Sequence, residues 1–400
     1  MIRIKPVIEQ NSVCPYCSVP MDNRDVLWHG IHVCVISVCG KCGSEITSDL
    51  KVGHAMSYPY QADVKKGRLF GKDPALSWFG NPLLNSLRNP LSDHDVGFRV
   101  ERIKRCTKAI ILNCIDFLYG HTLLKLLNAE SHLKGSLDAG LVVLVPGYLR
   151  WLVPDGVAEV WTVDMPLSKA QNYYPVLDRR IKRECERFYE VFVSSAHSHP
   201  KDFDITLFTR TSRHDFGSKR YRITFIWRED RPWLAENLIL RAARGFNLMG
   251  LLLFWQNLKV RRLFSLLRKS FPDAVFTVAG LGKRTSFPAW IQDKRVGRFT
   301  EESEREACGV YSESRLVIGV HGSNMLLPSA HAGMTMDLMP ESRWANFAQD
   351  VLYQEHDSRL SSFVYRYLPA NIKVSLLNAI LRAQVSGFLK YRRAMLDGLR

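Results

Sequence analysis

The sequence lacks any apolar run long enough to cross a bilayer. Its longest apolar run, around residues 248–255, is far shorter than the roughly 18–20 residues that a membrane-spanning helix needs. Residues 1–6 contain no apolar segment of the kind found in secretory signals. We therefore expect a cytoplasmic protein that is not integral to a membrane.

Acidic residues are few in comparison with basic ones. The chain has 39 Asp and Glu residues against 55 Lys and Arg residues, which gives a formal net charge of +16. Such a charge favours polyanionic partners, namely nucleic acid, anionic lipid headgroups or phosphorylated small molecules. The charge alone does not choose among them.

The composition has no bias toward disordered, collagen-like or disulfide-stapled classes. Of the 400 residues, 46% are hydrophobic and 24% are charged, as in an ordinary globular protein. A chain of this length has room for two or three domains of roughly 100–200 residues each.

The nine cysteines are unevenly distributed, and four of them form two C-x-x-C pairs near the start of the chain. Cys14 pairs with Cys17, and Cys39 pairs with Cys42. Two such turns supply four thiolates with the tetrahedral geometry that Zn²⁺ prefers, so the spacing predicts a structural zinc site in a zinc-ribbon-like module. In a cytoplasmic protein this is a better interpretation than disulfides. We expect the scattered cysteines to be inert: Cys106, Cys114, Cys185 and Cys308.

Three alternatives to this ligand set remain. Cys34 or His32 could replace one of the four ligands, and the cysteines could be buried without metal. A redox dithiol is less favoured, because no βαβ pattern surrounds Cys14 and Cys17.

From residue 108 onward, short apolar runs alternate with helical patterns, which predicts parallel sheets covered on both faces. The expected strands are 109–115, 140–145, 158–163, 221–227, 274–279, 315–320 and, as the last, 334–339. The fold class is therefore α/β, with two Rossmann-like domains preceded by a small zinc ribbon. The expected segments are a zinc-ribbon-like module at 1–50, a linker with short elements at 51–105, a first (acceptor) Rossmann-like domain at 106–218, a second (donor-binding) one at 219–345, and C-terminal helices at 346–400 that pack back on the core.

The loops after the strands are the candidate ligand sites, because open parallel sheets bind ligands at the carboxyl ends of their strands. The strongest candidate is the loop His321, Gly322, Ser323 and Asn324, where glycine permits close backbone approach and a following helix offers free amides to an anion. A buried histidine and a Ser or Asn helix cap would explain the same residues structurally.

The segment 314–329, followed by 334–340, resembles the family-61 glycosyltransferases. Their signature is a strand ending in Gly-Val-His-Gly-Ala-Gly, then a helix and a strand ending in Pro. The upstream strand followed by Arg228 and Arg231 resembles the start of that family's donor domain. The resemblance covers about residues 221–345, and the chain departs from it at Ser323 and Asn324.

The resemblance implies a GT-B fold and transfer of a sugar from a nucleotide-sugar donor to a hydroxyl acceptor, without a catalytic metal. The acceptor would be a glycan or lipid-linked glycan in bacterial polysaccharide or glycoconjugate biosynthesis. Cationic side chains would then neutralise the leaving diphosphate. Arg228, Arg231 and Lys283 follow donor-half strands and are the candidates. Alternatively, they are solvated charges or ion-pair partners of Glu229 or Asp230.

Displacement at the anomeric carbon also needs a base for the acceptor hydroxyl. Asp116 and His121 follow the first strand of the first half, and either could serve; Asp164 is a further candidate. The structural alternative is that Asp116 caps the next helix and His121 packs against the sheet.

Other classes fit less well. A metal-dependent GT-A enzyme would need a well-placed Asp-x-Asp, and the candidates Asp93 to Asp95 and Asp202 to Asp204 do not follow strands. In a nucleic-acid-binding protein, the zinc ribbon and the positive charge would contact phosphates, but the basic residues are spread along the chain. The charge could also hold the protein at an anionic membrane face, as a peripheral contact at the inner membrane.

Overall fold

The computed structural model describes the chain except residues 73–74, 93–94, 136–137, 234–236, 353–356 and 398–400. The chain divides into two compact units, Met1–Phe208 and Thr209–Arg400, each of which is described by itself. Within the described residues, none of the helices combines the length and the apolar character that crossing a bilayer requires.

The first unit is built around a six-stranded sheet in the order β1-β11-β8-β9-β10-β7. Its strands are β1 (Ile2–Lys5), β11 (Glu190–Val193), β8 (Lys108–Asn113), β9 (Gly140–Pro146), β10 (Glu159–Asp164) and β7 (Gly97–Arg102). The four inner strands are parallel, whereas β1 and β7 pair antiparallel at the two edges. The strands β8, β9 and β10 are almost fully buried, which explains why they were recognisable as apolar runs, whereas the four-residue β11, with its alternating burial, was not predicted.

The first unit also contains an antiparallel sheet of five strands, which lie between β1 and β7 in the sequence. It contains β2 (Asp22–Trp28), β3 (Val33–Val38), β4 (Glu45–Asp49), β5 (Gln61–Asp63) and β6 (Arg68–Phe70). Trp28 and Val35 share a buried core with Ile111 and Val142 of the parallel sheet. The predicted ribbon (1–50) and linker (51–105) thus lie within the first unit, because their short strands bury apolar side chains against the larger sheet.

The helices of the first unit connect its strands. They are α1 (Asn81–Arg88), α2 (Tyr119–Leu126), α3 (Ala129–Lys134), α4 (Pro175–Glu186) and α5 (Ile205–Thr209), which ends at the boundary between the units. The α4 helix packs against β2, and its Asp178 carboxylate accepts a hydrogen bond of 2.7 Å from the Trp28 amide.

The second unit contains a six-stranded, all-parallel sheet in the order β14-β13-β12-β15-β16-β17. The strands are β12 (Arg222–Arg228), β13 (Val275–Leu281), β14 (Gln292–Val296), β15 (Ser314–Val320), β16 (Thr335–Met339) and β17 (Tyr365–Pro369). Numbered along the chain, this order is 3-2-1-4-5-6, the classic Rossmann order, so the α/β class with Rossmann-like sheets is confirmed. The prediction that 334–339 is the last strand was wrong, because β17 pairs in parallel with β16.

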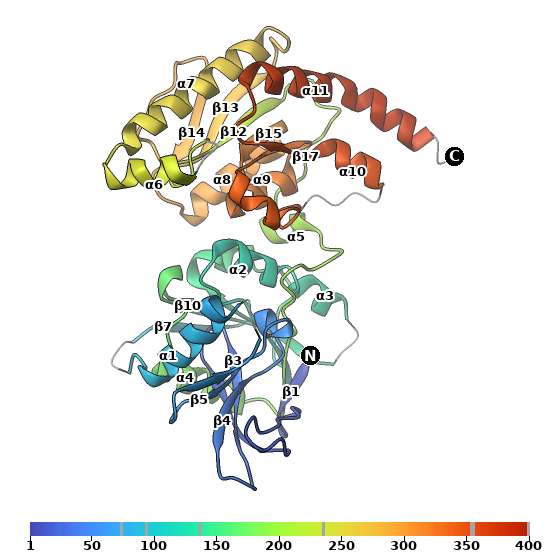
Figure 1. Cartoon of the computed structure of the whole chain (residues 1–400). Helices are drawn as coiled ribbons and strands as arrows, with labels where there is room; N and C mark the ends of the chain where they lie inside the picture. The colour runs from blue at the N-terminus through green and yellow to red at the C-terminus, as the bar shows by residue number, and fades with distance from the viewer. Residues whose placement is uncertain (73–74, 93–94, 136–137, 234–236, 353–356, 398–400) are drawn as a thin grey trace. The chain divides into compact units, whose positions relative to one another are not determined.

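The helices of the second unit cover this sheet (Figure 1). They are α6 (Asn237–Gly245), α7 (Met249–Arg268), α8 (Glu301–Ser312), α9 (Leu326–His331), α10 (Ser358–Val364) and α11 (Val374–Asp397). Leu377, Leu381 and Phe388 of α11 lie in the same buried core as Leu263 and Leu316. The last helix therefore packs on the core of the second unit.

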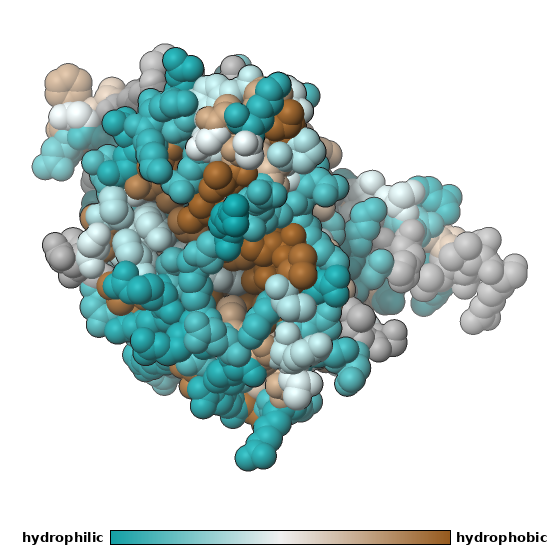
Figure 2. Space-filling model, turned by 90° about the horizontal axis from the view of Figure 1, so that it is seen from below, coloured by the Kyte–Doolittle hydropathy of each residue, from teal (hydrophilic) through white to brown (hydrophobic). Residues whose placement is uncertain are grey.

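Polar residues cover most of the surface that faces the reader in Figure 2, and hydrophobic residues form smaller patches among them. Exposed apolar side chains are normal on a protein surface when they are scattered singly. A cluster of them within a short segment is informative, and one such cluster is considered below.

Candidate functional site

The strand order of the second unit reverses between β12 and β15, and open parallel sheets bind ligands at this switch point. Arg228 ends β12, and His321 follows β15 directly. The two strands are paired in parallel, so their carboxyl ends lie at the same edge of the sheet. The structure thus brings Arg228 and the loop beginning at His321 together.

Gly322 lies between two guanidinium groups. Its φ of 143° and ψ of −179° belong to a region that is essentially restricted to glycine. A Cβ atom at this position would lie 2.7 Å from Nη1 of Arg228 and 2.9 Å from Nη1 of Arg231. Both predicted arginines therefore converge on the backbone of this loop.

Hydrogen bonds fix the two arginines. Arg228 Nη1 donates to Oδ1 of Asn324 over 2.6 Å, and Arg231 Nη1 donates to the His321 carbonyl oxygen over 2.6 Å. Arg228 also forms a bidentate ion pair with Asp230. This pair is the structural alternative foreseen from the sequence, but it involves only one of the two guanidinium groups. We call Arg228, Arg231, His321, Gly322 and Asn324 the switch-point site.

Two buried carboxylates hold the His321 ring. Nδ1 of His321 lies 3.1 Å from Oδ2 of Asp337 and 3.1 Å from Oδ2 of Asp350. Tyr365 and Tyr367, both in β17, donate hydrogen bonds of 3.2 Å and 2.8 Å to Asp337 and Asp350, respectively. The last strand of the sheet therefore supports the histidine of the loop.

These carboxylates favour the charged imidazolium form of His321. Burial alone would lower its pKa, but hydrogen bonds with Asp337 and Asp350 raise the pKa to about 9. Burial raises the pKa of Asp337 to about 8. Burial, followed by the charges of Arg228 and Arg343, lowers the pKa of Arg231 to about 10, which still leaves it protonated at neutral pH.

The raised pKa of His321 predicts a pH dependence of stability. The folded protein holds a proton up to about pH 9, whereas the unfolded chain loses it near pH 6.5. The stabilisation is therefore complete below pH 6.5, and the free energy of unfolding should fall as pH rises toward 9. Urea unfolding at pH 6, 7.5 and 9 measures this slope.

His321→Gln should reduce the slope between pH 6.5 and 9. His214→Gln is the matched control, because burial lowers the pKa of His214 and its removal should leave this slope in place. An unchanged slope in His321→Gln would contradict the assigned ionisation.

One cation of the switch-point site lacks a carboxylate at close range: among the described residues, none lies within ion-pair distance of Arg231. The amide nitrogen Nδ2 of Asn324 is buried and has no hydrogen-bond partner in the described part of the chain. Its orientation is fixed, because its Oδ1 accepts from Arg228. A guanidinium that has no carboxylate partner in the described part of the chain, together with an amide donor that has no hydrogen-bond partner there, favours an anionic ligand.

Two other predicted residues, Ser323 and Lys283, form no hydrogen bond with this network in the described part of the chain. Ser323 is exposed at the tip of the loop. Lys283 follows β13, which pairs with β12 on the side away from β15. The charge of Lys283 helps to lower the pKa of Asp293. Glu229 binds the backbone amide and side chain of Arg284 near Lys283.

In the first unit, Asp116 lies at the centre of a buried polar cluster. Its Oδ2 is 2.6 Å from Nε2 of His54 and 2.9 Å from Nζ of Lys125. Its Oδ1 accepts a hydrogen bond from the Leu118 amide and lies 3.4 Å from Nδ1 of His121. Burial alone would raise the pKa of Asp116, but Lys125 and the two histidines hold it well below its usual value.

The two predicted catalytic residues, Asp116 and His121, differ in their exposure to solvent. Asp116 has no exposed surface, so it cannot touch an acceptor hydroxyl in this conformation, whereas His121 is about one-third exposed. Asp116 also accepts a hydrogen bond from the amide of Leu118, the residue before α2, but no side chain caps this helix, so the capping interpretation is not supported. Asp164, the further candidate, is exposed and pairs with Arg99.

The four predicted zinc ligands form a single cluster. Cys14, Cys17, Cys39 and Cys42 place their sulfur atoms within 4.8 Å of one another, with Cys14 3.6 Å from Cys42 and Cys17 3.4 Å from Cys39. Four sulfurs at about 2.3 Å from one tetrahedral ion would lie close to these distances. The cluster could therefore hold a metal ion.

The two cysteine turns have the same backbone. The amide of Ser18 donates to the Cys14 carbonyl, and the amide of Gly43 donates to the Cys39 carbonyl, both over 2.9 Å. Ser18 and Gly43 both have positive φ. The second turn thus has a glycine, Gly43, where the first turn has Ser18.

His32 and Cys34 do not join the four-cysteine cluster. Nδ1 of His32 and Sγ of Cys34 both contact Oδ1 of Asp49, at 2.9 Å and 3.4 Å. Neither residue belongs to the group of four sulfurs, so the alternative ligand sets are not supported.

Two more clusters place metal-ligating atoms within 4.8 Å of one another: His54 with Asp116 and His121, and His321 with Asp337 and Asp350. In both, protein groups already contact the carboxylates, namely Lys125 in the first and the β17 tyrosines in the second. Of the Asp-x-Asp candidates, Asp93 lies outside the described residues, Asp95 pairs with Arg180, and Asp204 binds Thr206.

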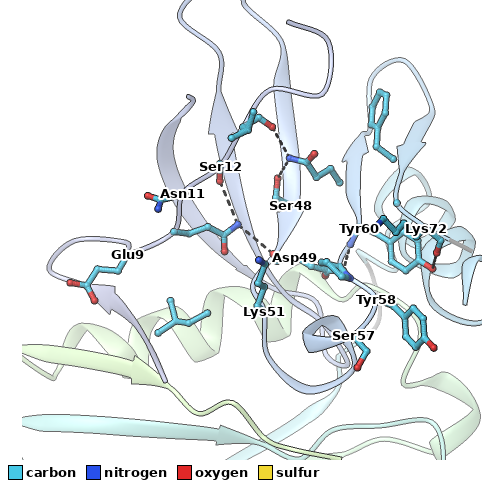
Figure 3. Close-up of a pocket in the computed structure, with 17 residues that line it drawn as sticks. Glu9, Asn11, Ser12, Ser48, Asp49, Lys51, Ser57, Tyr58, Tyr60 and Lys72 are labelled. Carbon is cyan, nitrogen blue, oxygen red and sulfur yellow. Dashed lines mark hydrogen bonds between the residues drawn. The ribbon is translucent and has the colours of Figure 1, made fainter. Parts of the chain in front are cut away.

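A pocket of about 670 Å³ lies beside the five-stranded sheet (Figure 3). Its walls include Ser12, Ser48, Tyr58 and Lys51, with Glu9 at one side. Gln61 already donates to the Ser48 hydroxyl. The pocket is lined mainly by residues of the N-terminal segment rather than by strand-end loops of a parallel sheet, and it was therefore not predicted.

Several residues of these sites were not predicted. Lys125 and His54 enclose Asp116, and Asp337, Asp350, Tyr365 and Tyr367 surround His321. One signal was present, since Asp337 is a charged residue in the middle of an otherwise apolar, buried strand.

No family model matches the chain, and no curated protein matches it in sequence. A solved structure with some similarity is that of the E. coli ADP-heptose lps heptosyltransferase II, with 11% identity and a TM-score of 0.37. The match covers 71% of this chain and 98% of that one.

Proposed function

We propose that the protein is a glycosyltransferase whose second unit binds the diphosphate of a nucleotide-sugar donor at the switch-point site. The observation that carries this proposal is the convergence of the Arg228 and Arg231 guanidinium groups on Gly322, at the switch point of a Rossmann-ordered sheet. The resemblance of 221–345 to family-61 glycosyltransferases supports a nucleotide-sugar rather than another phosphorylated ligand.

The cationic groups would act on the leaving group. As the acceptor oxygen bonds to the anomeric carbon, the bond from that carbon to the diphosphate oxygen breaks, and negative charge develops on the diphosphate. Arg231 and the His321 imidazolium supply positive charge there, and the unpaired Asn324 amide supplies a donor. We assign Lys283 and Ser323 peripheral roles in donor binding, and no metal is required by this step.

On the acceptor side, we assign the base to His121, with Asp116 as the positioning residue. The carboxylate lies on the Nδ1 side of the ring, which leaves Nε2 for the hydroxyl proton. The acceptor would be the hydroxyl of a glycan or lipid-linked glycan, in cytoplasmic steps of polysaccharide or glycoconjugate biosynthesis.

The four-cysteine cluster would bind structural zinc. All four ligands are thiolates, and no position is left open for a substrate, as in structural zinc sites. The ion would tie the loop before β2 to the β3–β4 turn.

A thermal-shift series with UDP, GDP, ADP and CMP tests the donor site. One nucleotide at about 100 times its Kd should stabilise the second unit by about 2.7 kcal/mol, which raises Tm by roughly 5–10 °C. Arg231→Ala should abolish this shift, and Arg382→Ala, an exposed arginine on α11, should retain it. If no nucleotide shifts the wild type, and random oligonucleotides bind instead with steep salt dependence, the proposal is wrong.

A further inference from the structure

The α6–α7 pair has one face in the core and one face in solvent. On α7, Leu253, Val260, Phe264 and Leu267 belong to the buried core of the second unit. Figure 1 shows α7 along the outside of the sheet, joined to α6 at the left edge of this unit. The opposite face of α7 is therefore open to a partner.

Five large apolar side chains are exposed within ten residues at the start of this face. They are Phe246, Leu248, Leu251, Phe254 and Trp255, and we call them the apolar tip. Phe246 is 77% exposed and Trp255 is 54% exposed. The spacing of residues 251, 254 and 255 places them on one side of the helix. Such a cluster marks an interaction surface rather than scattered exposure.

The same face of α7 becomes basic toward its other end. Exposed positions 261, 262, 268 and 269 continue the helical series begun at 251, and we call Arg261, Arg262, Arg268 and Lys269 the basic stripe. Arg268 lies over the Trp290 ring, 5.2 Å from its centre. None of the four forms an ion pair with a carboxylate in the described part of the chain.

No acidic residue accompanies these cations in the sequence. Residues 237–272 contain no Asp or Glu, although acidic residues make up 39 of the 400 in the whole chain. The same segment contains seven cations: Arg241, Arg244, Lys259, Arg261, Arg262, Arg268 and Lys269. Seven of the 55 cations thus share a short segment with five exposed large apolar side chains, and no acidic residue of that segment offsets their charge.

We propose that this face of the α6–α7 pair binds the surface of an anionic lipid bilayer. The apolar tip would enter the boundary between headgroups and acyl chains, and the basic stripe would contact anionic headgroups. The basic stripe repels a second copy of itself, which argues against self-association through this face. A nucleic acid offers no apolar layer into which the aliphatic side chains of Leu248 and Leu251 could insert, which argues against a nucleic acid as the partner of this face. The inference is independent of the proposed transferase activity.

Co-sedimentation with vesicles tests the proposal. The wild type should bind vesicles of phosphatidylcholine mixed with phosphatidylglycerol, bind vesicles of phosphatidylcholine alone weakly, and be released in part by about 0.5 M NaCl. Phe254→Gln/Trp255→Gln and Arg261→Glu/Arg262→Glu should each lower the partition coefficient at least roughly tenfold. Both variants should retain the nucleotide response or, if there is none, the wild-type Tm.

Two matched controls distinguish an effect of this face from a general effect of lost positive charge or lost apolar surface. Lys390→Glu/Arg393→Glu makes the same charge change on α11, and Trp78→Gln removes another exposed tryptophan. Both should bind vesicles like the wild type. Equal binding by all variants, or no preference for anionic vesicles, would overturn the proposal. So would a wild-type dimer in light scattering that Phe254→Gln/Trp255→Gln converts to a monomer, since a second copy would then occupy the face.

Discussion

Gly322→Ala should weaken binding of the nucleoside diphosphate by at least about 100-fold, or about 2.7 kcal/mol. The new methyl group would lie 2.7 Å from Arg228 Nη1 and 2.9 Å from Arg231 Nη1, so both guanidinium groups would have to move. The backbone conformation at this position would also be strained by roughly 1–3 kcal/mol in any residue with a Cβ. Calorimetric titration with the nucleotide identified by thermal shift measures the affinity.

Gly309→Ala is the matched control for this substitution. Gly309 lies in α8, where an added Cβ meets no atom within 4 Å, and alanine should stabilise the helix by about 0.5–1 kcal/mol without changing affinity. A folded Gly322→Ala variant with wild-type affinity would place the diphosphate elsewhere. If the variant does not fold, Arg231→Ala, which introduces no backbone strain, decides the question.

If the four-cysteine cluster binds zinc, as proposed above, removal of the zinc should destabilise the first unit by an amount on the order of 10 kcal/mol, the scale of zinc binding to small folded sites. The effect should extend beyond the cysteine loops, because Trp28 and Val35 of the five-stranded sheet help to form the core of the parallel sheet. Cys39→Ser should abolish zinc binding, measured as one equivalent per chain by elemental analysis, and should lower the Tm of the first unit.

Cys106→Ser provides the comparison. Cys106 is half-buried and lies outside the cluster, so this variant should retain one equivalent of zinc. If the wild type contains no zinc, and a chelator leaves its Tm unchanged, the four cysteines are buried thiols, the alternative left open by the sequence.

The central strands and the cysteine cluster were predictable, because each depends on local sequence. The strand containing residues 316–320 is buried on both faces and is therefore a continuous apolar run. The two C-x-x-C turns can be recognised from the spacing of their cysteines alone. The loop His321 to Asn324 could be placed at a strand end for the same reason.

The supporting residues could not be predicted, because partners distant in sequence define them. Strand β17 is a short, mixed segment, and only its pairing with β16 makes it a strand. Asp116 looked like an accessible base at a strand end, but His54, which lies 62 residues earlier, and Lys125 enclose it. Asp350 and Tyr367 likewise reach His321 from segments that follow the recognisable motif.

The arrangement of the second sheet has a consequence for how the protein is made. The histidine loop is synthesised by residue 324, but its carboxylate Asp350, the tyrosines of β17 and the core residue Phe388 of α11 all follow it. During synthesis, the loop therefore leaves the ribosome before the groups that hold it. The switch-point site is completed only when nearly the whole chain has been translated, so truncated chains should lack it even when they contain every residue of the motif.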